Sequence, residues 1–365
     1  MSRRAYLDWL RGIAVVIMVM AHVTDAWTRP ADRQSRLYMI TIFVSGLAAP
    51  LFLFLAGLTM SMAASMRSTR VGHAAAASLA RLRGLQVFAL AFLFRVQSQL
   101  LGWGALVNIL KVDILNVMGL AMVAAAVAWG WSERRHVRIA LFAITMVLVA
   151  MSTPLVREWA LLSPLPDPIE AYIRPLPGRT NFALFPWAAF VFAGAIAGEL
   201  IHAASSIATE RRLQVALFSA GVAGIGIAYA ASLQPSIYPV SNFWTSSPTF
   251  FFIRLGICVA MLPISWMVDG FHGVVRARLP HLPPDVPGRV LSTLGRSSLF
   301  VYWIHVEMAY GGVSRPVKQA LPLQASLVAT VLLLAVLYGI TRWKDRTMRD
   351  VALTGAWRIF APVLK

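Results

Sequence analysis

The sequence predicts an all-α fold: a polytopic integral membrane protein with about ten transmembrane helices packed in one bundle. Of the 365 residues, 58% are apolar and 13% are charged, whereas a soluble domain carries roughly 25% charged residues. Apolar runs of about 20 residues, which can cross a hydrocarbon core of ~30 Å, recur along the chain. No segment between these runs is long enough to fold separately. We therefore expect a transmembrane domain over 1–342 and a cytoplasmic amphipathic tail over 343–365.

The ten apolar segments also predict an orientation. They cover residues 6–27, 38–66, 84–103, 112–131, 137–153, 181–203, 212–232, 249–268, 295–314 and 321–341. The N-terminus, the connections after every second helix and the C-terminal tail hold 20 arginines and lysines, while the opposite side holds nine. The positive-inside rule then makes both termini cytoplasmic, as in a multi-pass protein of the cell inner membrane.

Charge and motifs exclude several classes of protein. The net charge of +18 lies in short connections between apolar runs, which argues against a nucleic-acid partner. Cys258 is the single cysteine, and the sequence holds no Cys/His cluster with the spacing of a metal site, so we expect no metal. Asp8 and Arg11 interrupt the first apolar run, so we expect a retained helix there rather than a cleaved leader. The motifs of common soluble enzymes are absent from the sequence.

Ionisable residues inside transmembrane segments are costly and are often functional. On a helix over 6–27, Asp8, Arg11, His22 and Asp25 fall within one arc of about 100°. One interpretation is that Asp8 pairs with Arg11 at the membrane interface and that His22 is a satisfied buried imidazole. The other is that Asp25, three residues after His22, orients the ring and raises its basicity, as a general base requires.

The segment 295–314 repeats this pattern. Ser298, Tyr302 and His305 share a helix face, and Arg296 and Glu307 fall on the opposite side. His305 is expected about 14 Å from the cytoplasmic end, near the bilayer midplane. Two interpretations are open for Tyr302 and His305: they form hydrogen bonds between helices, or they belong to a reactive site.

Four more polar residues lie in or beside the apolar segments. Arg95, in the third segment, needs an internal partner or a water-filled cavity. Asp113 and Asn116 open the fourth segment, where Asp113 suits either a substrate contact or a favourable charge at a helix N-terminus. Arg254 lies near an outer helix end, where its side chain can reach the interface.

Several of these segments resemble the heparan-α-glucosaminide N-acetyltransferase catalytic family of membrane acyltransferases and its bacterial relatives. The spacing of Arg11 and His22 is also similar to that of the broader acyltransferase-3 group. The matching segments run from Leu7 to His22, Phe52 to Leu58, Lys111 to Asn116, Asn181 to Trp187, Asn242 to Pro248, and Leu294 to His305.

The resemblance implies an enzyme that moves an acyl group, expected to be acetyl from cytoplasmic acetyl-CoA, to a sugar on the outer face. His22 matches the family's catalytic histidine, and Arg11 matches the arginine of the same motif. The lysosomal member has a long Gly- and aromatic-rich segment after its first conserved helix, whereas this chain continues directly to Asp25, Trp27 and Thr28. The glucosamine acceptor is therefore not carried over.

The chemistry of acyl transfer assigns expected roles to these residues. It needs a base for the acceptor and donors for the developing oxyanion. The expected catalytic residues are His22, Asp25 and His305, with His305, Tyr302 or Arg95 as oxyanion donors. Anionic CoA needs cationic contacts. We expect its contacts among Arg11, Arg81, Arg83, Arg95, Arg296 and Tyr302, and substrate contacts at Asp113, Asn116 and Arg254.

The expected partners are acetyl-CoA or another acyl-CoA, a saccharide or glycan acceptor, and membrane lipid, with a homodimer left open. The alternative function is a proton-coupled secondary transporter, or a glycan or lipid flippase, that uses the same buried ionisable residues. Such proteins typically contain internal repeats with paired interrupted helices. The sequence shows neither, which favours the acyltransferase.

The orientation is directly testable. Cysteines introduced into the 154–180 connection should react with a membrane-impermeant reagent added from outside, because the basic residues predict that this connection is external. Labelling from the cytoplasmic side alone would contradict the predicted orientation.

Overall fold

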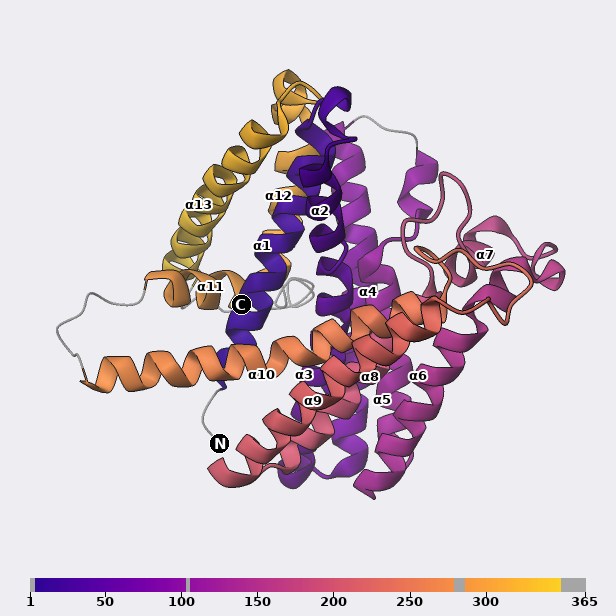
Figure 1. Cartoon of the computed structure of the whole chain (residues 1–365), viewed down its shortest axis with the longest axis vertical. Coiled ribbons are helices and arrows are strands. Elements are labelled where there is room, and N and C mark those ends of the chain that lie inside the picture. The colour runs from indigo at the N-terminus through magenta and orange to yellow at the C-terminus, as the bar shows by residue number, and fades with distance from the viewer. Residues whose placement is uncertain (1–3, 103–105, 279–285, 349–365) are drawn as a thin grey trace. The chain divides into compact units, whose positions relative to one another are not determined.

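The computed structural model describes residues 4–102, 106–278 and 286–348 (Figure 1). The model is 82% helical, with no strand in the described part of the chain, which confirms the predicted all-α fold. The α-helices are α1 (Ala5–Trp27), α2 (Arg36–Ser45), α3 (Ala48–Val71), α4 (His73–Gly102), α5 (Ile114–Gly130), α6 (Arg135–Glu158), α7 (Asp167–Ile173), α8 (Leu184–Ala203), α9 (Ile207–Ser232), α10 (Pro248–Arg278), α11 (Val286–Arg296), α12 (Ser298–Tyr310) and α13 (Leu323–Thr347). Short 3₁₀ turns occur at Pro30–Asp32, Leu106–Leu110, Ala160–Leu162 and Gly312–Val317.

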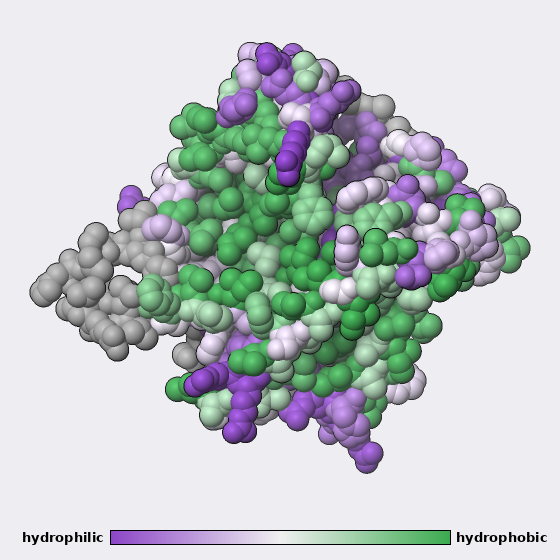
Figure 2. Space-filling model, viewed as in Figure 1, coloured by the Kyte–Doolittle hydropathy of each residue, from purple (hydrophilic) through white to green (hydrophobic). Residues whose placement is uncertain are grey.

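Eight helical spans in the described residues are long and apolar enough to cross a membrane, with Arg36–Val71 counted as one span. Helix α5 is apolar but shorter. Figure 2 shows apolar residues over the visible faces of α6 and α13, with hydrophilic residues gathered at the helix ends. Leu332 of α13 is 64% exposed, as expected of a side chain that faces lipid. The chain is thus a multi-pass membrane protein, while the count of ten spans and the orientation stay predictions.

Two predicted spans contain a break. The 38–66 span divides into α2 and α3, which are separated by Gly46 and Leu47. The 295–314 span is wrong as a single helix, because α11 ends at Arg296 and α12 begins at Ser298. Ser297 has φ −101° and ψ 24° at this break, and its hydroxyl accepts a hydrogen bond from the buried Lys344 of α13 (3.1 Å). This polar contact, which sequence periodicity does not reveal, holds the break in place.

The chain divides into two compact units. The first comprises Met1–Ala49, Leu100–Trp103 and Ile264–Lys365, and the second comprises Pro50–Gln99 and Gly104–Pro263. The predicted tail over 343–365 begins within α13, and its residues after 348 lie outside the described part of the chain.

Helix α1 is the central helix of the first unit, where it packs against α11, α12 and α13. Its contact with α11 is close at two glycines. A Cβ at Gly12 would lie 2.2 Å from the Leu291 carbonyl oxygen, and one at Gly295 would lie 2.0 Å from that of Asp8. Glycine is therefore required at both positions, and the close approach fixes α11 along the first half of α1.

Helix α8 has the corresponding place in the second unit, where it packs against α5 and α6. Its glycines also lie close to α3, since a Cβ at Gly194 would lie 1.8 Å from the Phe54 carbonyl oxygen. A Cβ at Gly198 would lie 2.4 Å from that of Leu58. The small-residue run from Phe192 to Gly198 is thus a helix-packing surface, as its composition predicts.

Hydrogen bonds tie the end of α1 to the start of α13. Leu321 donates to the Trp27 carbonyl (2.9 Å), and Arg29 donates its backbone N–H to the Leu321 carbonyl (2.9 Å). Asp32 accepts the backbone N–H of Leu323, the first residue of α13, at 2.9 Å. This hydrogen bond, together with the nearby guanidinium of Arg29, lowers the pKa of Asp32 below its ordinary value of 3.8.

The lowered pKa makes stability depend on pH. A carboxyl group whose pKa is lower in the folded state stabilises the fold above its unfolded pKa, and this contribution is lost as pH falls through the folded value. Asp32→Asn should therefore lower the melting temperature of the purified protein at pH 7, and the difference from wild type should shrink below pH 3.8. A control variant, Glu158→Gln, changes an exposed carboxylate at the end of α6. A difference that persists unchanged at low pH would contradict this account.

Candidate active site

The predicted polar residues of α1 and α12 meet in the first unit. His22 and Asp25 lie near the end of α1, while His305 and Tyr310 lie on α12. The indole Nε1 of Trp27 donates to the Ala309 carbonyl oxygen (2.9 Å), which ties the ends of the two helices together. Because α1 is one continuous helix, the predicted polar stripe continues along it to this site.

Tyr310 connects His22 to Asp25. Its hydroxyl oxygen lies 2.7 Å from Asp25 Oδ2 and 3.1 Å from His22 Nδ1. The sequence predicted that Asp25 orients His22 from three residues away, and the structure joins them through this third side chain. The only sequence signal for Tyr310 is a phenol near the end of a helix that also carries His305, and that signal is weak.

The hydrogen-bonding partners of Tyr310 indicate where the proton of a neutral His22 ring lies. An ionised carboxylate can only accept hydrogen bonds, so the Tyr310 hydroxyl donates its one proton to Asp25. The phenol oxygen then accepts, and His22 must donate from Nδ1. The neutral ring therefore has a lone pair on Nε2, the form that a general base uses.

His305 lies beside His22, with the ring centroids 5.0 Å apart. Its Nδ1 lies 2.9 Å from the Val301 carbonyl oxygen, which can only accept, so the neutral ring is protonated on Nδ1. His305 is fully buried, and its Nε2 has no hydrogen-bond partner in the described residues. In this tautomer Nε2 accepts, so the expected role of neutral His305 as an oxyanion donor does not fit. The Tyr302 ring packs edge-on against the His305 ring, with the two ring centroids 5.8 Å apart.

Two of the predicted CoA contacts adjoin each other near the other end of α1. Arg11 Nη1 lies 3.6 Å from Asp8 Oδ1, and the Arg11 side chain stays partly exposed. Arg296 is exposed and ends α11, directly after Gly295. A Cβ at Gly295 would lie 3.1 Å from the Arg11 Cβ, so the two arginines come from touching parts of α1 and α11.

Three other predicted residues belong to the second unit and bind one another. Arg95 donates to Asp113 (2.7 Å), and Asp113 caps the N-terminus of α5 in a capping box with Asn116. The Asn116 amide donates to the Tyr172 hydroxyl (3.2 Å). Burial raises the pKa of Tyr172, and the hydrogen bond from Asn116 partly opposes this effect. Arg95 therefore has the internal partner that its position requires, and Asp113 has the helix-terminal role that was one of its two interpretations.

The remaining predicted cations also lie in the second unit. Arg81 is exposed on α4 and donates to Ser78 (2.9 Å), and Arg83 is half-buried on the same helix. The Arg254 guanidinium lies over the Phe250 ring, 3.9 Å from its centroid.

Helix α8 also carries a buried carboxylate, Glu199, that the sequence predictions do not include. Glu199 is fully buried and accepts hydrogen bonds from Ser61 (2.7 Å), Trp129 (2.8 Å) and Arg138 (2.6 Å). Ser65 also donates to it (2.8 Å). A buried charge with four hydrogen-bonding partners is satisfied, so this cluster holds α3, α5, α6 and α8 together rather than forming a reactive site.

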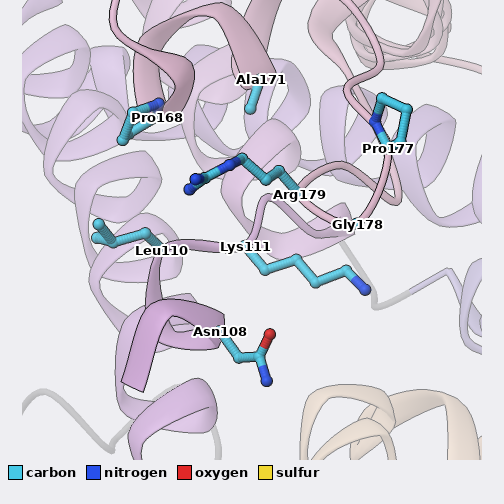
Figure 3. A pocket seen from close by; sticks show the side chains of 8 residues that line it. All are labelled: Asn108, Leu110, Lys111, Pro168, Ala171, Pro177, Gly178 and Arg179. Carbon is cyan, nitrogen blue, oxygen red and sulfur yellow. The ribbon is translucent and has the colours of Figure 1, made fainter. Parts of the chain in front are cut away.

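A small hollow of about 200 Å³ lies beside the start of α5 (Figure 3). Lys111 and Arg179 line the hollow and come from two neighbouring segments. The backbone N–H of Val112 donates to the Arg179 carbonyl (2.9 Å) and joins these segments. Arg179 pairs with Asp167 (3.0 Å). The hollow is smaller than typical ligand pockets, which begin at roughly 300 Å³. We therefore assign no ligand to it.

Comparison with known proteins identifies a family. The family model described as heparan-alpha-glucosaminide N-acetyltransferase, catalytic, matches residues 3–229, which is more than half of the chain. The match includes α1 with His22 and Asp25. A search of curated proteins finds no match.

The proton position on His22 can be measured. In protein labelled with ¹⁵N-histidine, the His22 signals of the neutral ring should show a protonated Nδ1 and an unprotonated Nε2, because the Tyr310 hydroxyl accepts from Nδ1. Tyr310→Phe removes that acceptor and should abolish the preference. His22→Gln assigns the signals among the seven histidines. A wild-type ring protonated mainly on Nε2 would contradict the proposed direction of the hydrogen bonds.

Proposed function

The chain belongs to the heparan-alpha-glucosaminide N-acetyltransferase catalytic family, and from this premise we propose that it transfers acetyl from cytoplasmic acetyl-CoA to an amino sugar of a glycan on the outer face of the inner membrane. The family match implies an acetyltransferase, and the apolar helices make it a multi-pass membrane protein. The observation that carries the proposal is the chain of hydrogen bonds from Asp25 through Tyr310 to His22.

The proposed reaction uses His22 Nε2 as the base. The amine nitrogen of the acceptor attacks the acetyl carbonyl carbon while Nε2 takes a proton from that nitrogen. The tetrahedral intermediate then collapses, the carbon–sulfur bond breaks, and the CoA thiolate leaves. The imidazolium returns its proton to the sulfur, which gives CoA and the acetylated sugar.

Asp25 and Tyr310 act as positioning residues in this reaction. They hold the proton of neutral His22 on Nδ1, and the negative charge of Asp25 favours the imidazolium that forms during transfer. We propose that His305 Nε2, a buried acceptor with no hydrogen-bond partner among the described residues, binds a second N–H or an O–H of the acceptor sugar. Such a contact would hold the reacting amine beside His22.

We propose that Arg11 and Arg296 contact the phosphates of CoA. Arginines bind phosphate through paired hydrogen bonds, and these two come from adjoining segments in the first unit. Arg11 precedes His22 by eleven residues, about 16 Å along the helix axis, a separation that the extended pantetheine arm can bridge. Arg81, Arg83 and Tyr302 stay as further proposed contacts of the donor. Arg95 is proposed to position α5 through Asp113 instead.

A second route uses the same residues. In that route His22 Nε2 attacks the thioester, CoA leaves, and the acetyl-imidazole then transfers its acetyl group to the amine. Both routes require the lone pair on Nε2, so both depend on the tautomer that Tyr310 imposes. Detection of acetylated His22 after incubation with acetyl-CoA alone distinguishes the second route from direct transfer.

The catalytic proposal is tested by the variants of three residues. His22→Ala should lose at least about 100-fold in kcat, a typical contribution of a general base, and His22→Gln should be little better, since an amide cannot accept the proton. Asp25→Asn and Tyr310→Phe should each lose less, about tenfold, because the imidazole remains. Thiol release from acetyl-CoA with glucosamine as the probe acceptor measures each rate.

The controls separate catalysis from folding. Tyr229→Phe removes an exposed phenol from α9 and should leave the rate unchanged. Tyr310→Phe should also shift the pH profile of kcat, since the tautomer and the basicity of His22 change together, whereas a structural defect would lower activity equally at every pH. A folded His22→Ala protein that retains most of its activity rules out both routes.

A further inference from the structure

The ends of three long apolar helices meet around a cavity in the second unit. Its volume is about 320 Å³, within the range of typical ligand pockets. It is lined by the last turn of α6, the segment that enters α8, the turn before α10 and the first two turns of α10. Each of these helices is long and apolar enough to cross a membrane, so their ends lie at the level of the lipid headgroups. The cavity therefore adjoins the membrane interface.

Arg254 brings a cation into the membrane-crossing part of α10. It follows Pro248, the first residue of the helix, by six positions, or about 9 Å along the axis. Its guanidinium carbon lies 3.9 Å from the Phe250 centroid and 5.8 Å from the Trp187 centroid. It forms no hydrogen bond or ion pair with any residue that the structure describes. The rings stabilise its charge but leave its N–H donors without acceptors, so the guanidinium is suited to bind an anion.

Arg157 provides a second cation at the end of α6. It donates through Nη2 to the Thr245 carbonyl (2.6 Å), while its buried Nε has no hydrogen-bond partner in the described part of the chain. Asn242 orders the same turn, because its side chain accepts the backbone N–H of Trp244 (3.0 Å) and the hydroxyl of Thr245 (3.2 Å). The described residues that line the cavity include no aspartate or glutamate. Two arginines thus line it without a lining carboxylate to balance their charge.

Trp244 and Phe250 form an aromatic wall of the cavity. Their centroids lie 5.1 Å apart with the rings at 79°. Trp244 is 58% exposed, and Trp159, directly after α6, is 52% exposed. Exposed tryptophans are typical of the headgroup level of a bilayer, where one end of the ring meets apolar chains and the other meets polar groups. The wall therefore suits a ligand that has a polar head and apolar chains.

We propose that this cavity binds the headgroup of an anionic phospholipid, with its phosphate paired to Arg254, supported by Arg157, and its glycerol against Trp244. An arginine inside a membrane span is costly unless it is paired, and lipid phosphate is an anion present at the depth of the helix ends. A zwitterionic headgroup fits less well, because its ammonium would lie near two arginines. Lipid binding requires neither acetyl-CoA nor His22, so this proposal and the proposed function can fail separately.

The test is native mass spectrometry of the purified full chain in an uncharged detergent, titrated with dioleoyl phosphatidylglycerol. Dioleoyl phosphatidylcholine, which has the same acyl chains and also a phosphate, is the matched lipid. The first phosphatidylglycerol should bind at least about fivefold more tightly, the effect expected of one arginine near an anionic headgroup. Arg254→Gln should remove most of this preference, and Arg254→Lys should restore part of it because the charge returns without the planar fork.

A control variant and a second measurement keep the test decisive. Arg212→Gln removes an exposed arginine from α9 of the same unit and should leave the preference intact. A phosphatidylglycerol with a photoreactive group near its glycerol locates the site in the wild-type chain, even if an Arg254 variant fails to fold. It should label the peptide that carries Trp244 and Phe250, and excess phosphatidylglycerol should suppress this labelling more strongly than phosphatidylcholine does.

Four results would overturn the proposal. They are equal affinity for the two lipids, a preference that survives undiminished in Arg254→Gln, photolabelling confined to other peptides, and displacement of the first lipid by inorganic phosphate. The last result would show a site for a free anion, because inorganic phosphate shares the charged group of the lipid but lacks its glycerol and acyl chains.

Discussion

The Tyr310 hydroxyl has one proton to donate and lies between a carboxylate and an imidazole. Asp25 can only accept, so the proton goes to Asp25, and the Tyr310 oxygen accepts from His22 Nδ1. In the neutral ring, the lone pair on His22 Nε2 follows from this arrangement. Without Tyr310, His22 and Asp25 still share the end of one helix, but nothing in this arrangement determines which nitrogen of the ring is basic.

The packing of the first unit serves this alignment. The glycine contacts between α1 and α11 fix one end of α1, and the Trp27–Ala309 hydrogen bond fixes α12 at the other. The break at Ser297, held by Lys344, lets α11 and α12 follow different directions along α1. In the second unit the buried Glu199 has a similar structural role. Its carboxylate needs hydrogen-bond donors, and these donors come from the helices that pack around α8.

Much of the fold follows from hydrophobic length and composition. The apolar runs, the polar stripe of α1 and the glycine packing surface of α8 each depend on local sequence, so periodicity and residue size reveal them. The break at Ser297, the role of Tyr310 and the Glu199 cluster depend on contacts between residues far apart in the chain. Tyr310 and Asp25 are separated by 285 positions, and no local pattern predicts that they meet.

The same distinction applies to the candidate site. His22 and His305 were identified because an ionisable residue in an apolar helix is conspicuous, and the structure brings their rings together. For Arg95 and Asp113 the sequence left two interpretations open, and the structure pairs these residues with each other in the second unit. An isolated sequence position cannot show whether a buried charge is already paired, and that pairing separates a structural residue from a reactive one.

A double-mutant cycle on kcat tests the central claim most directly. If Asp25 acts on His22 through Tyr310, the two residues work in series, and Asp25→Ala should cost little once Tyr310→Phe has broken the connection. The double variant should then be about as active as the weaker single variant. Losses that multiply in the double variant would show that Asp25 and Tyr310 act independently, and they would contradict the proposed connection.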